Sequence, residues 1–198
     1  MIKTYKKTTT TDEPILRIGY DRDAQSPREW DNLGYFITVD SRYHSPDHNS
    51  ELESIVKVTG YEAGNQEEHI KLITEKIETE MNEKVLAIYP VVKYEHSGVV
   101  YKLGTCHGFD YSNNGFYIVT DKSLEATEAD KKDFEKIIKA ELEDYNSYAN
   151  GEVYEYTLYN ELGEIIDSGA DYYDLEDIRN NLPEEWAKVD LYKYLVSD

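Results

Sequence analysis

DFEKIIKAELEDYNSYANG, residues 133–151, has the clearest helical pattern in the chain. Its apolar residues recur three and four positions apart, as they do on one face of an amphipathic α-helix. These residues are Phe134, Ile137, Ile138, Leu142 and Tyr145. Thr127, with Asp130 three residues later, is expected to cap this helix, and Asn150-Gly151 to end it. We therefore predict a long helix that buries one face against another layer.

A second helix is predicted over 65–81, where Ile70, Ile73, Ile77 and Met81 form one apolar stripe. The stretch before it, 44–64, is polar and rich in helix-breaking residues, so we expect a loop with a short helical turn over 52–56. Leu175, Ile178 and Leu182 predict another helix, and Pro183 is expected to open a last one that turns Trp186, Val189 and Tyr192 or Tyr194 inward.

Runs of β-branched and aromatic residues predict strands on either side of the helices. These runs are 14–20, 35–43, 84–95, 99–103 and 115–120. Farther along, 152–160 and 164–168 flank a turn that contains Gly163, which predicts a hairpin. The pattern as a whole predicts an α+β fold with a central, mostly antiparallel sheet, two main amphipathic helices, and a C-terminal hairpin plus short helices.

The length of 198 residues suits one domain, so we expect 1–198 to form a single α+β domain. Within it, 1–12 are expected to form a frayed end, and 152–198 an acidic C-terminal hairpin and helical segment. Cys106 is the only cysteine, and the sequence contains neither a secretory signal nor an apolar run long enough to span a bilayer. We therefore expect a cytoplasmic protein with no membrane partner.

The chain is strongly acidic, with 41 Asp and Glu against 21 Lys and Arg and a net charge of -20. This charge opposes direct binding to the phosphates of nucleic acids and favours a protein partner with a basic surface. The excess is uneven, because residues from Asp121 onward carry -14 and the first 120 residues carry -6. The chain also has 19 Tyr against 4 Phe, a composition typical of protein interfaces.

Acidic and tyrosine side chains gather around the end of the helix at 133–151 and the strand that follows it. These candidate partner-binding residues are Glu141, Glu143, Asp144, Tyr145, Tyr148, Glu152, Tyr154 and Glu155. On a rigid scaffold they could imitate the regularly spaced charges of DNA and occupy a basic channel in a nucleic-acid-handling protein. The alternative interpretation is a solvated helix face that contributes solubility only.

Two groups of residues are candidate metal ligands. Asp21, Asp23 and Asp31 crowd one loop, although their spacing lacks the glycine that a calcium loop needs. A zinc site would require two loops to converge and bring together His44, His48, Cys106 and His107. The alternative to a binding protein is therefore a metal-binding module, or an enzyme that depends on zinc or another divalent metal. Turn-forming aspartates and surface histidines explain the same residues without a cofactor.

Enzyme signatures are missing from the sequence. It contains no glycine-rich phosphate loop, no nucleophile elbow and no zinc-protease signature. We therefore expect no catalytic residues and a protein that is not an enzyme.

The loop SPREWDNLG, residues 26–34, resembles a signature of small proteins encoded by phages and mobile elements of Gram-positive bacteria. Further similar blocks are 42–43, YEHSG at 94–98, Asp110, GFYIVT at 115–120, and 141–153, so that the resemblance covers roughly 15–160. Most members of this family have no assigned activity. The chain departs from the family at Thr38, Asp40 and His107, where members carry cysteine or histidine, and a family metal site is therefore not implied.

A phage setting implies a function by analogy. Small acidic phage proteins are often inhibitors that bind a restriction or CRISPR-Cas nuclease in place of DNA. Together with the charge, the resemblance predicts an anti-CRISPR or antirestriction inhibitor that acts in the cytoplasm of the host bacterial cell.

Overall fold

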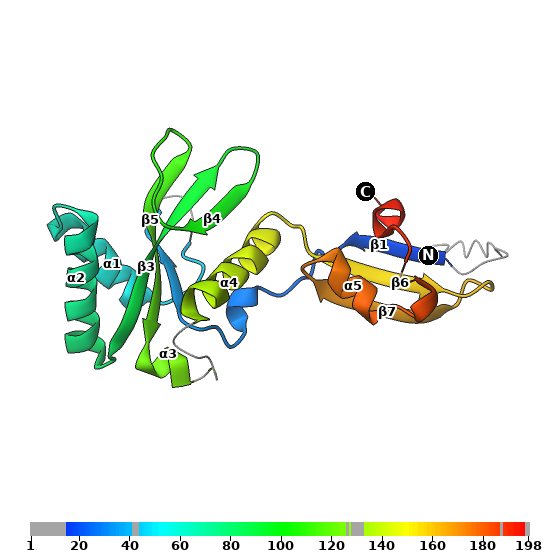
Figure 1. Ribbon diagram of the computed structural model, residues 1–198, viewed down its shortest axis with the longest axis horizontal. Helices are drawn as coiled ribbons and strands as arrows, with labels where there is room; N and C mark the ends of the chain where they lie inside the picture. The colour runs from blue at the N-terminus through cyan, green and yellow to red at the C-terminus, as the bar shows by residue number, and fades with distance from the viewer. Residues whose placement is uncertain (1–14, 41–43, 126, 128–132, 187, 197–198) are drawn as a thin grey trace, which may run out of the picture. The chain divides into compact units, whose positions relative to one another are not determined.

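The computed structural model of the protein describes residues 15–40, 44–125, 127, 133–186 and 188–196 (Figure 1). The predicted frayed end at 1–12 and the predicted capping residue Asp130 lie outside this part of the chain. The chain forms two compact units. We call residues 26–146 the central unit, and residues 1–25 together with 147–198 the terminal unit.

The central unit is built on an antiparallel sheet with the strand order β2-β5-β3-β4. The strands are β2 (Tyr35–Thr38), β3 (Val85–Glu95), β4 (Val99–Leu103) and β5 (Tyr111–Thr120). Its helices are α1 (Ser50–Glu62), α2 (Gln66–Lys76) with the π-helical turn η2 (Ile77–Met81), α3 (Asp121–Glu125) and α4 (Phe134–Ala149).

Helices cover both faces of this sheet, with α1 and α2 on one side and α4 on the other (Figure 1). Successive side chains of a strand point to opposite faces, so adjacent residues of β5 enter different cores. Phe116 and Ile118 pack with Leu52 and Ile73 of the first two helices. Tyr117 and Val119 pack with the apolar stripe of α4, namely Phe134, Ile138 and Leu142.

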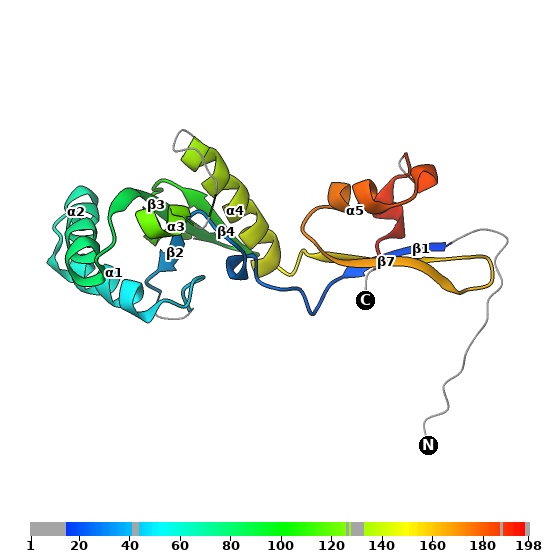
Figure 2. The same cartoon turned by 90° about the horizontal axis from the view of Figure 1, so that it is seen from below.

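The terminal unit is built on a second antiparallel sheet with the order β1-β6-β7. The strands are β1 (Ile15–Tyr20), β6 (Tyr154–Tyr159) and β7 (Ile165–Tyr172). One face of the sheet is covered by α5 (Leu175–Asn181) and by the short 3-10 turns η4 (Glu184–Trp186) and η5 (Leu191–Tyr194) (Figure 2). Its core comprises Leu16, Ile18, Tyr156, Leu158, Leu175, Ile178, Leu182 and Leu191.

The α+β class is confirmed, but the strands divide between two sheets instead of forming one central sheet. The two units likewise differ from the single domain that we expected for 1–198. The reason lies in one long-range pairing. β1 does not join the strands that follow it in sequence and instead pairs with β6, where Ile18 lies opposite Tyr156. The predicted hairpin and helical segment 152–198 therefore acquires its third strand from the other end of the chain.

Two predictions about helices were wrong in their extent. The expected turn at 52–56 is the 13-residue helix α1, which buries Leu52, Ile55, Val56 and Thr59 at helical spacing. The expected last helix after Pro183 consists of the short turns η4 and η5. No helix in the described part of the chain is long and apolar enough to cross a membrane.

Candidate partner-binding site

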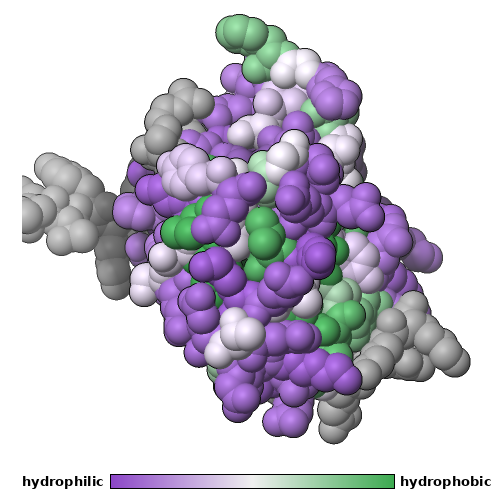
Figure 3. Space-filling view, turned by 90° about the vertical axis from the view of Figure 1, so that its left-hand side faces the viewer, coloured by the Kyte–Doolittle hydropathy of each residue, from purple (hydrophilic) through white to green (hydrophobic). Residues whose placement is uncertain are grey.

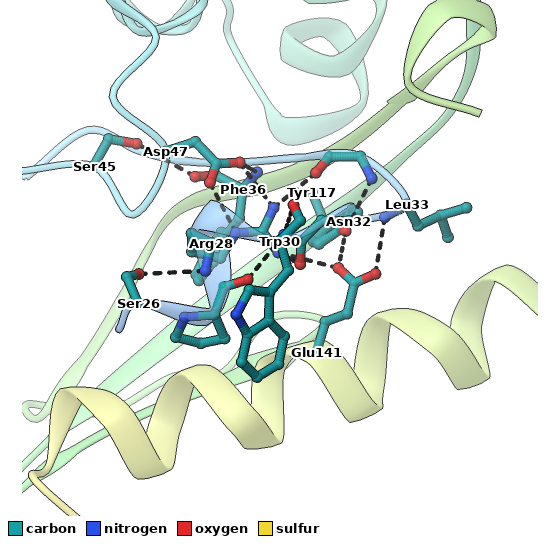
Figure 4. Close-up of polar contacts among 12 residues, drawn as sticks. Ser26, Arg28, Trp30, Asn32, Leu33, Phe36, Ser45, Asp47, Tyr117 and Glu141 are labelled. Atoms are coloured by element: carbon teal, nitrogen blue, oxygen red, sulfur yellow. Dashed lines mark hydrogen bonds and ion pairs between the residues drawn. The ribbon is translucent and has the colours of Figure 1, made fainter. Parts of the chain in front are cut away.

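The loop 26–34 of the central unit is organised around the side chain of Arg28, which is 3% exposed (Figure 4). Its Nε and one terminal nitrogen each donate at 2.8 Å to the carboxylate of Asp47, in a bidentate ion pair. The same guanidinium donates to the carbonyl of Gly34 at 2.7 Å and to Oδ1 of Asn32 at 2.8 Å. The charge and hydrogen bonds of Asp47 outweigh the opposing effect of burial, so that the pKa of Arg28 is raised.

Glu141 of α4 closes this network from the opposite side. Its Oε2 accepts a hydrogen bond from Arg28 at 3.0 Å and another from the hydroxyl of Tyr117, while Oε1 accepts from the backbone N–H of Leu33 at 2.9 Å. The Tyr117 hydroxyl in turn accepts from the N–H of Gly34 at 3.0 Å. Burial, together with the charge of Glu141, raises the pKa of Tyr117.

This network holds the loop against the core and is therefore structural. The carboxylates of Asp47 and Glu141 each bond the buried arginine and a backbone N–H, so neither carboxylate is directed at a partner. What the loop presents to solvent is Trp30, which is 47% exposed, between the exposed side chains of Glu29 and Asp31.

A second buried cation in the central unit also uses acidic side chains internally. The ammonium of Lys93 pairs with Asp40 and lies 3.1 Å from a carboxylate oxygen of Glu95. Burial lowers the pKa of Lys93, but the hydrogen bonds to these two carboxylates outweigh it and raise the pKa above its ordinary value. Part of the acidic excess of the chain is thus used to neutralise buried cations.

The predicted partner-binding residues of α4 do not act as one surface. Glu141 belongs to the Arg28 network, and the ring of Tyr145 packs against Phe36 and Tyr101 at centroid distances of 5.5 and 5.6 Å. Asp144 is half-buried, and Glu143 is exposed. The helix periodicity explains this division, since positions 138, 141, 142 and 145 share the face that packs on the sheet.

The other four predicted residues lie in the terminal unit, and two of them belong to a cluster there. The ring of Tyr154 lies 5.4 Å from that of Tyr20. The pKa of Tyr154 is raised, first by burial and then by its neighbours Tyr20, Glu152, Tyr192 and Asp174. We call these five residues the acidic tyrosine patch. Tyr192 is 74% exposed and Tyr20 is 42% exposed, so aromatic rings and carboxylates reach solvent together.

The scaffold of the patch is regular secondary structure. Tyr20 ends β1 opposite Tyr154, the first residue of β6, and Asp174 is the N-cap of α5, where it accepts a hydrogen bond from the N–H of Glu176 at 2.7 Å. The remaining two predicted residues are placed differently. Tyr148 is half-buried, and Glu155 lies beside Gly19, on the face of the sheet away from Tyr154 and the core. Sequence reasoning missed Tyr20, Asp174 and Tyr192.

The acidic excess is shared by both units. The terminal unit has 17 acidic and 8 basic residues, a net charge of -9, and the central unit has 24 acidic and 13 basic residues, a net charge of -11. The larger negative charge of the residues after 120 is therefore not confined to one of the two units. Because the terminal unit is the smaller, its charge density is the higher.

The structure does not assemble the predicted metal ligands. Among the residues that it describes, no three His, Cys, Asp or Glu side chains are grouped as a metal ion would require. The rings of His44 and His48 pack edge to face, with their centroids 6.0 Å apart. Asp21 instead accepts hydrogen bonds from the N–H groups of Asp23 and Asp171 at 2.9 and 3.0 Å, as a turn-forming residue does. Asp31 and His107 are exposed, and Cys106 is half-buried.

A pocket of about 470 Å³ opens in the central unit where α1 and α2 meet. The helices contribute Gly60, Ala63, Asn65, Gln66 and His69. The segment after β4 and the strand β5 contribute Thr105, His107, Asn113 and Phe116. Figure 3, which looks onto the side of α1 and α2, shows a mostly hydrophilic surface with scattered hydrophobic residues. Apart from His107, these residues were not among the predicted sites. The one feature of the sequence that indicates the pocket is the helix-breaking stretch Ala63-Gly64-Asn65 between the two helices.

Comparisons of the chain with protein-family models, curated proteins and solved structures gave no match. The resemblance of the loop 26–34 to a phage family therefore stays a prediction from the residues.

Proposed function

We propose that the protein is a binding protein, not an enzyme, and that the acidic tyrosine patch of the terminal unit contacts a basic surface of a nucleic-acid-handling protein. The patch itself carries this proposal. It combines Glu152 and Asp174 with three tyrosines on a regular scaffold, and tyrosine rings supply large contact area at low entropic cost while their hydroxyls remain solvated.

The partner class follows from charge. Both units are acidic, so encounter with a basic protein is favoured and direct binding to nucleic acid is opposed. Nucleases have basic channels that bind phosphates, and carboxylates on a scaffold could take the place of those phosphates. We propose further that the protein is an inhibitor, encoded by a phage or mobile element, that binds a CRISPR-Cas or restriction nuclease in the host cytoplasm. The resemblance of the loop 26–34 implies this setting.

The test is co-purification of the full chain from a bacterial host that carries candidate nucleases. We expect a basic nuclease to be retained at low salt and progressively released as salt increases, because salt screens charges at a solvated interface. Tyr192→Ala should weaken retention about tenfold or more, since a truncated hot-spot tyrosine costs over 1.4 kcal/mol of binding.

Trp30→Ala is the control, because Trp30 is an aromatic residue that is 47% exposed but lies in the loop 26–34 of the central unit. It should leave retention unchanged. Equal losses for the two variants, or retention that does not change with salt, would remove the patch from the proposal.

A further inference from the structure

The pocket between α1 and α2 is bounded by hydrogen-bond acceptors. Nε2 of His69 lies 2.9 Å from the backbone carbonyl of Val56 and 3.1 Å from the hydroxyl of Thr59. Because a carbonyl only accepts, Nε2 must carry a proton, which makes Nδ1 of the neutral ring an acceptor. The ring is held edge-on to Phe116, with centroids 4.8 Å apart. No described residue bonds Nδ1.

The helix ends at the pocket add further negative potential. α1 ends at Glu62, and the last carbonyls of a helix lack intrahelical partners and carry partial negative charge. The opposing positive end of α2 is partly capped. Asn65 accepts from the N–H of Glu68 at 2.9 Å, and the carboxylate of Glu68 accepts from the N–H of Gly64 at 2.8 Å. An anion would therefore meet a helix N-terminus that is capped by Asn65 and has the carboxylate of Glu68 beside it.

The lining residues of the pocket include no Asp or Glu, but the charged residues that neighbour them in the sequence are acidic. Residues 60–69 include Glu62, Glu67 and Glu68 and no lysine or arginine, and 104–114 include Asp110 and no lysine or arginine. Glu62 and Glu67 are exposed, so they raise the local concentration of cations without blocking the pocket. The pocket volume lies within the range usual for side-chain and small-molecule sites.

We infer that this pocket receives an arginine side chain of the basic partner. A guanidinium offers five donors in a planar fork, and such a fork suits a site that combines the imidazole acceptor of His69, the side-chain oxygen of Gln66 and the last carbonyls of α1. The inference rests on the proposed function for the identity of the partner, but the binding chemistry belongs to the central unit alone. The pocket would be a second contact with the partner, because it lies in the central unit and the acidic tyrosine patch lies in the terminal unit.

The test is a titration of the isotopically labelled full chain with N-acetyl-arginine methylamide, followed by NMR at the ring Cε1–H of His69. We expect a saturable shift of the His69 signal with a midpoint in the millimolar range. The neutral isostere N-acetyl-citrulline methylamide should bind about fivefold more weakly or less well still, because hydrogen bonds from a charged donor are about twice as strong as neutral ones. Equal binding of the two probes, or no shift with either, would overturn the inference.

Two variants locate the site. His69→Phe keeps an aromatic ring but removes the acceptor, and it should abolish binding of the arginine probe as read at the side-chain amide of Gln66. Glu62→Gln combined with Glu67→Gln should weaken the probe about twofold or more. The control is Glu75→Gln, which removes one carboxylate of α2 at an exposed pair with Lys71, and it should have no effect. Unchanged binding by both pocket variants, with the amide spectrum of the fold intact, would also overturn the inference.

The two proposals can fail separately. The arginine probe reports on the pocket without any partner protein, whereas retention of a nuclease by Tyr192→Ala reports on the patch. If the arginine probe binds but no nuclease is retained, the proposed function fails and the pocket inference stands. If a nuclease is retained but the probe does not bind, the pocket inference fails and the proposed function stands.

Discussion

The Arg28 network of the central unit and the acidic tyrosine patch of the terminal unit are made of the same side chains, carboxylates and tyrosines. In the network, Glu141 and Tyr117 close around a buried guanidinium. In the patch, the neighbours that raise the pKa of Tyr154 are two tyrosines and two acids. The carboxylates of the network are thus used internally, whereas Glu152 and Asp174 of the patch are exposed to solvent.

The difference follows from the cost of burying charge. A buried ion is tolerated only when opposite charge and hydrogen bonds replace its lost hydration, as Asp47, Glu141 and Gly34 do for Arg28. Carboxylates near the surface retain their hydration and impose no such requirement. The two clusters should consequently respond to mutation in opposite ways, the network through stability and the patch through binding.

The largest expected effect is at the centre of the network. Arg28→Met removes the cation and leaves two half-buried carboxylates, Asp47 and Glu141, without their partner. We expect the free energy of unfolding to fall by about 3–5 kcal/mol, as for other broken buried ion pairs. Urea denaturation followed by far-UV circular dichroism measures it, and a loss below about 1 kcal/mol would show that the network is not structural.

A matched pair on α4 separates structural from solvated acids. Glu141→Gln weakens the bonds to Arg28 and to the N–H of Leu33 and should cost about 1–3 kcal/mol of stability. Glu143→Gln, two residues along at an exposed position, should change stability by less than about 0.5 kcal/mol. Equal effects in urea denaturation would contradict the division of the helix into two faces.

Alkaline pH tests the buried tyrosine of the network. The pKa of Tyr117 is raised by burial and by Glu141, whereas an unfolded tyrosine titrates near 10. The folded state therefore holds its proton at higher pH than the unfolded state. The stability gained from this difference is complete below about pH 10 and is lost as pH rises further, by about 1.4 kcal/mol per pH unit.

Tyr117→Phe should remove this contribution. Urea denaturation between pH 9 and 11 should then show a shallower fall in stability for the variant than for the unaltered chain. Parallel curves would mean that Tyr117 titrates normally in the folded protein.

The smallest expected effect on stability is in the patch. Glu152→Gln removes an exposed charge, and Asp174→Asn removes a charge while retaining an N-cap residue for α5. Together they should change the free energy of unfolding by less than about 0.5 kcal/mol. A loss above about 1.5 kcal/mol would show that the patch, like the network, is structural.

Local patterns in the sequence predicted most of the elements, because amphipathic periodicity is set by neighbouring residues. The helix at 65–81 and the strand at 99–103 were found at or near their predicted bounds, and α4 ends at Ala149, directly before the predicted end at Asn150-Gly151. The helix α1 was underestimated because Thr59, Gly60 and β-branched residues lower its intrinsic propensity, although burial of its stripe outweighs this.

The pairing of strands that are far apart in the sequence could not be predicted from such local patterns. The sequence gives no measure of which strand β1 joins, so the division into two units and the position of Tyr20 beside Tyr154 were missed. Nor does composition show which acids are used internally. Glu141 and Glu143 look alike in the sequence, and only the packing of α4 places one of them on Arg28.

The central claim is that the acidic tyrosine patch occupies a surface that a nuclease uses for DNA. The most direct measurement is competition: a nuclease retained by the protein is mixed with labelled duplex DNA, and the concentration of protein that displaces half of the DNA is determined. We predict displacement by the unaltered chain, and at least about tenfold weaker displacement by the Glu152→Gln/Asp174→Asn variant, equivalent to 1.4 kcal/mol of binding. DNA that stays bound at saturating protein, or equal displacement by the variant, would contradict it.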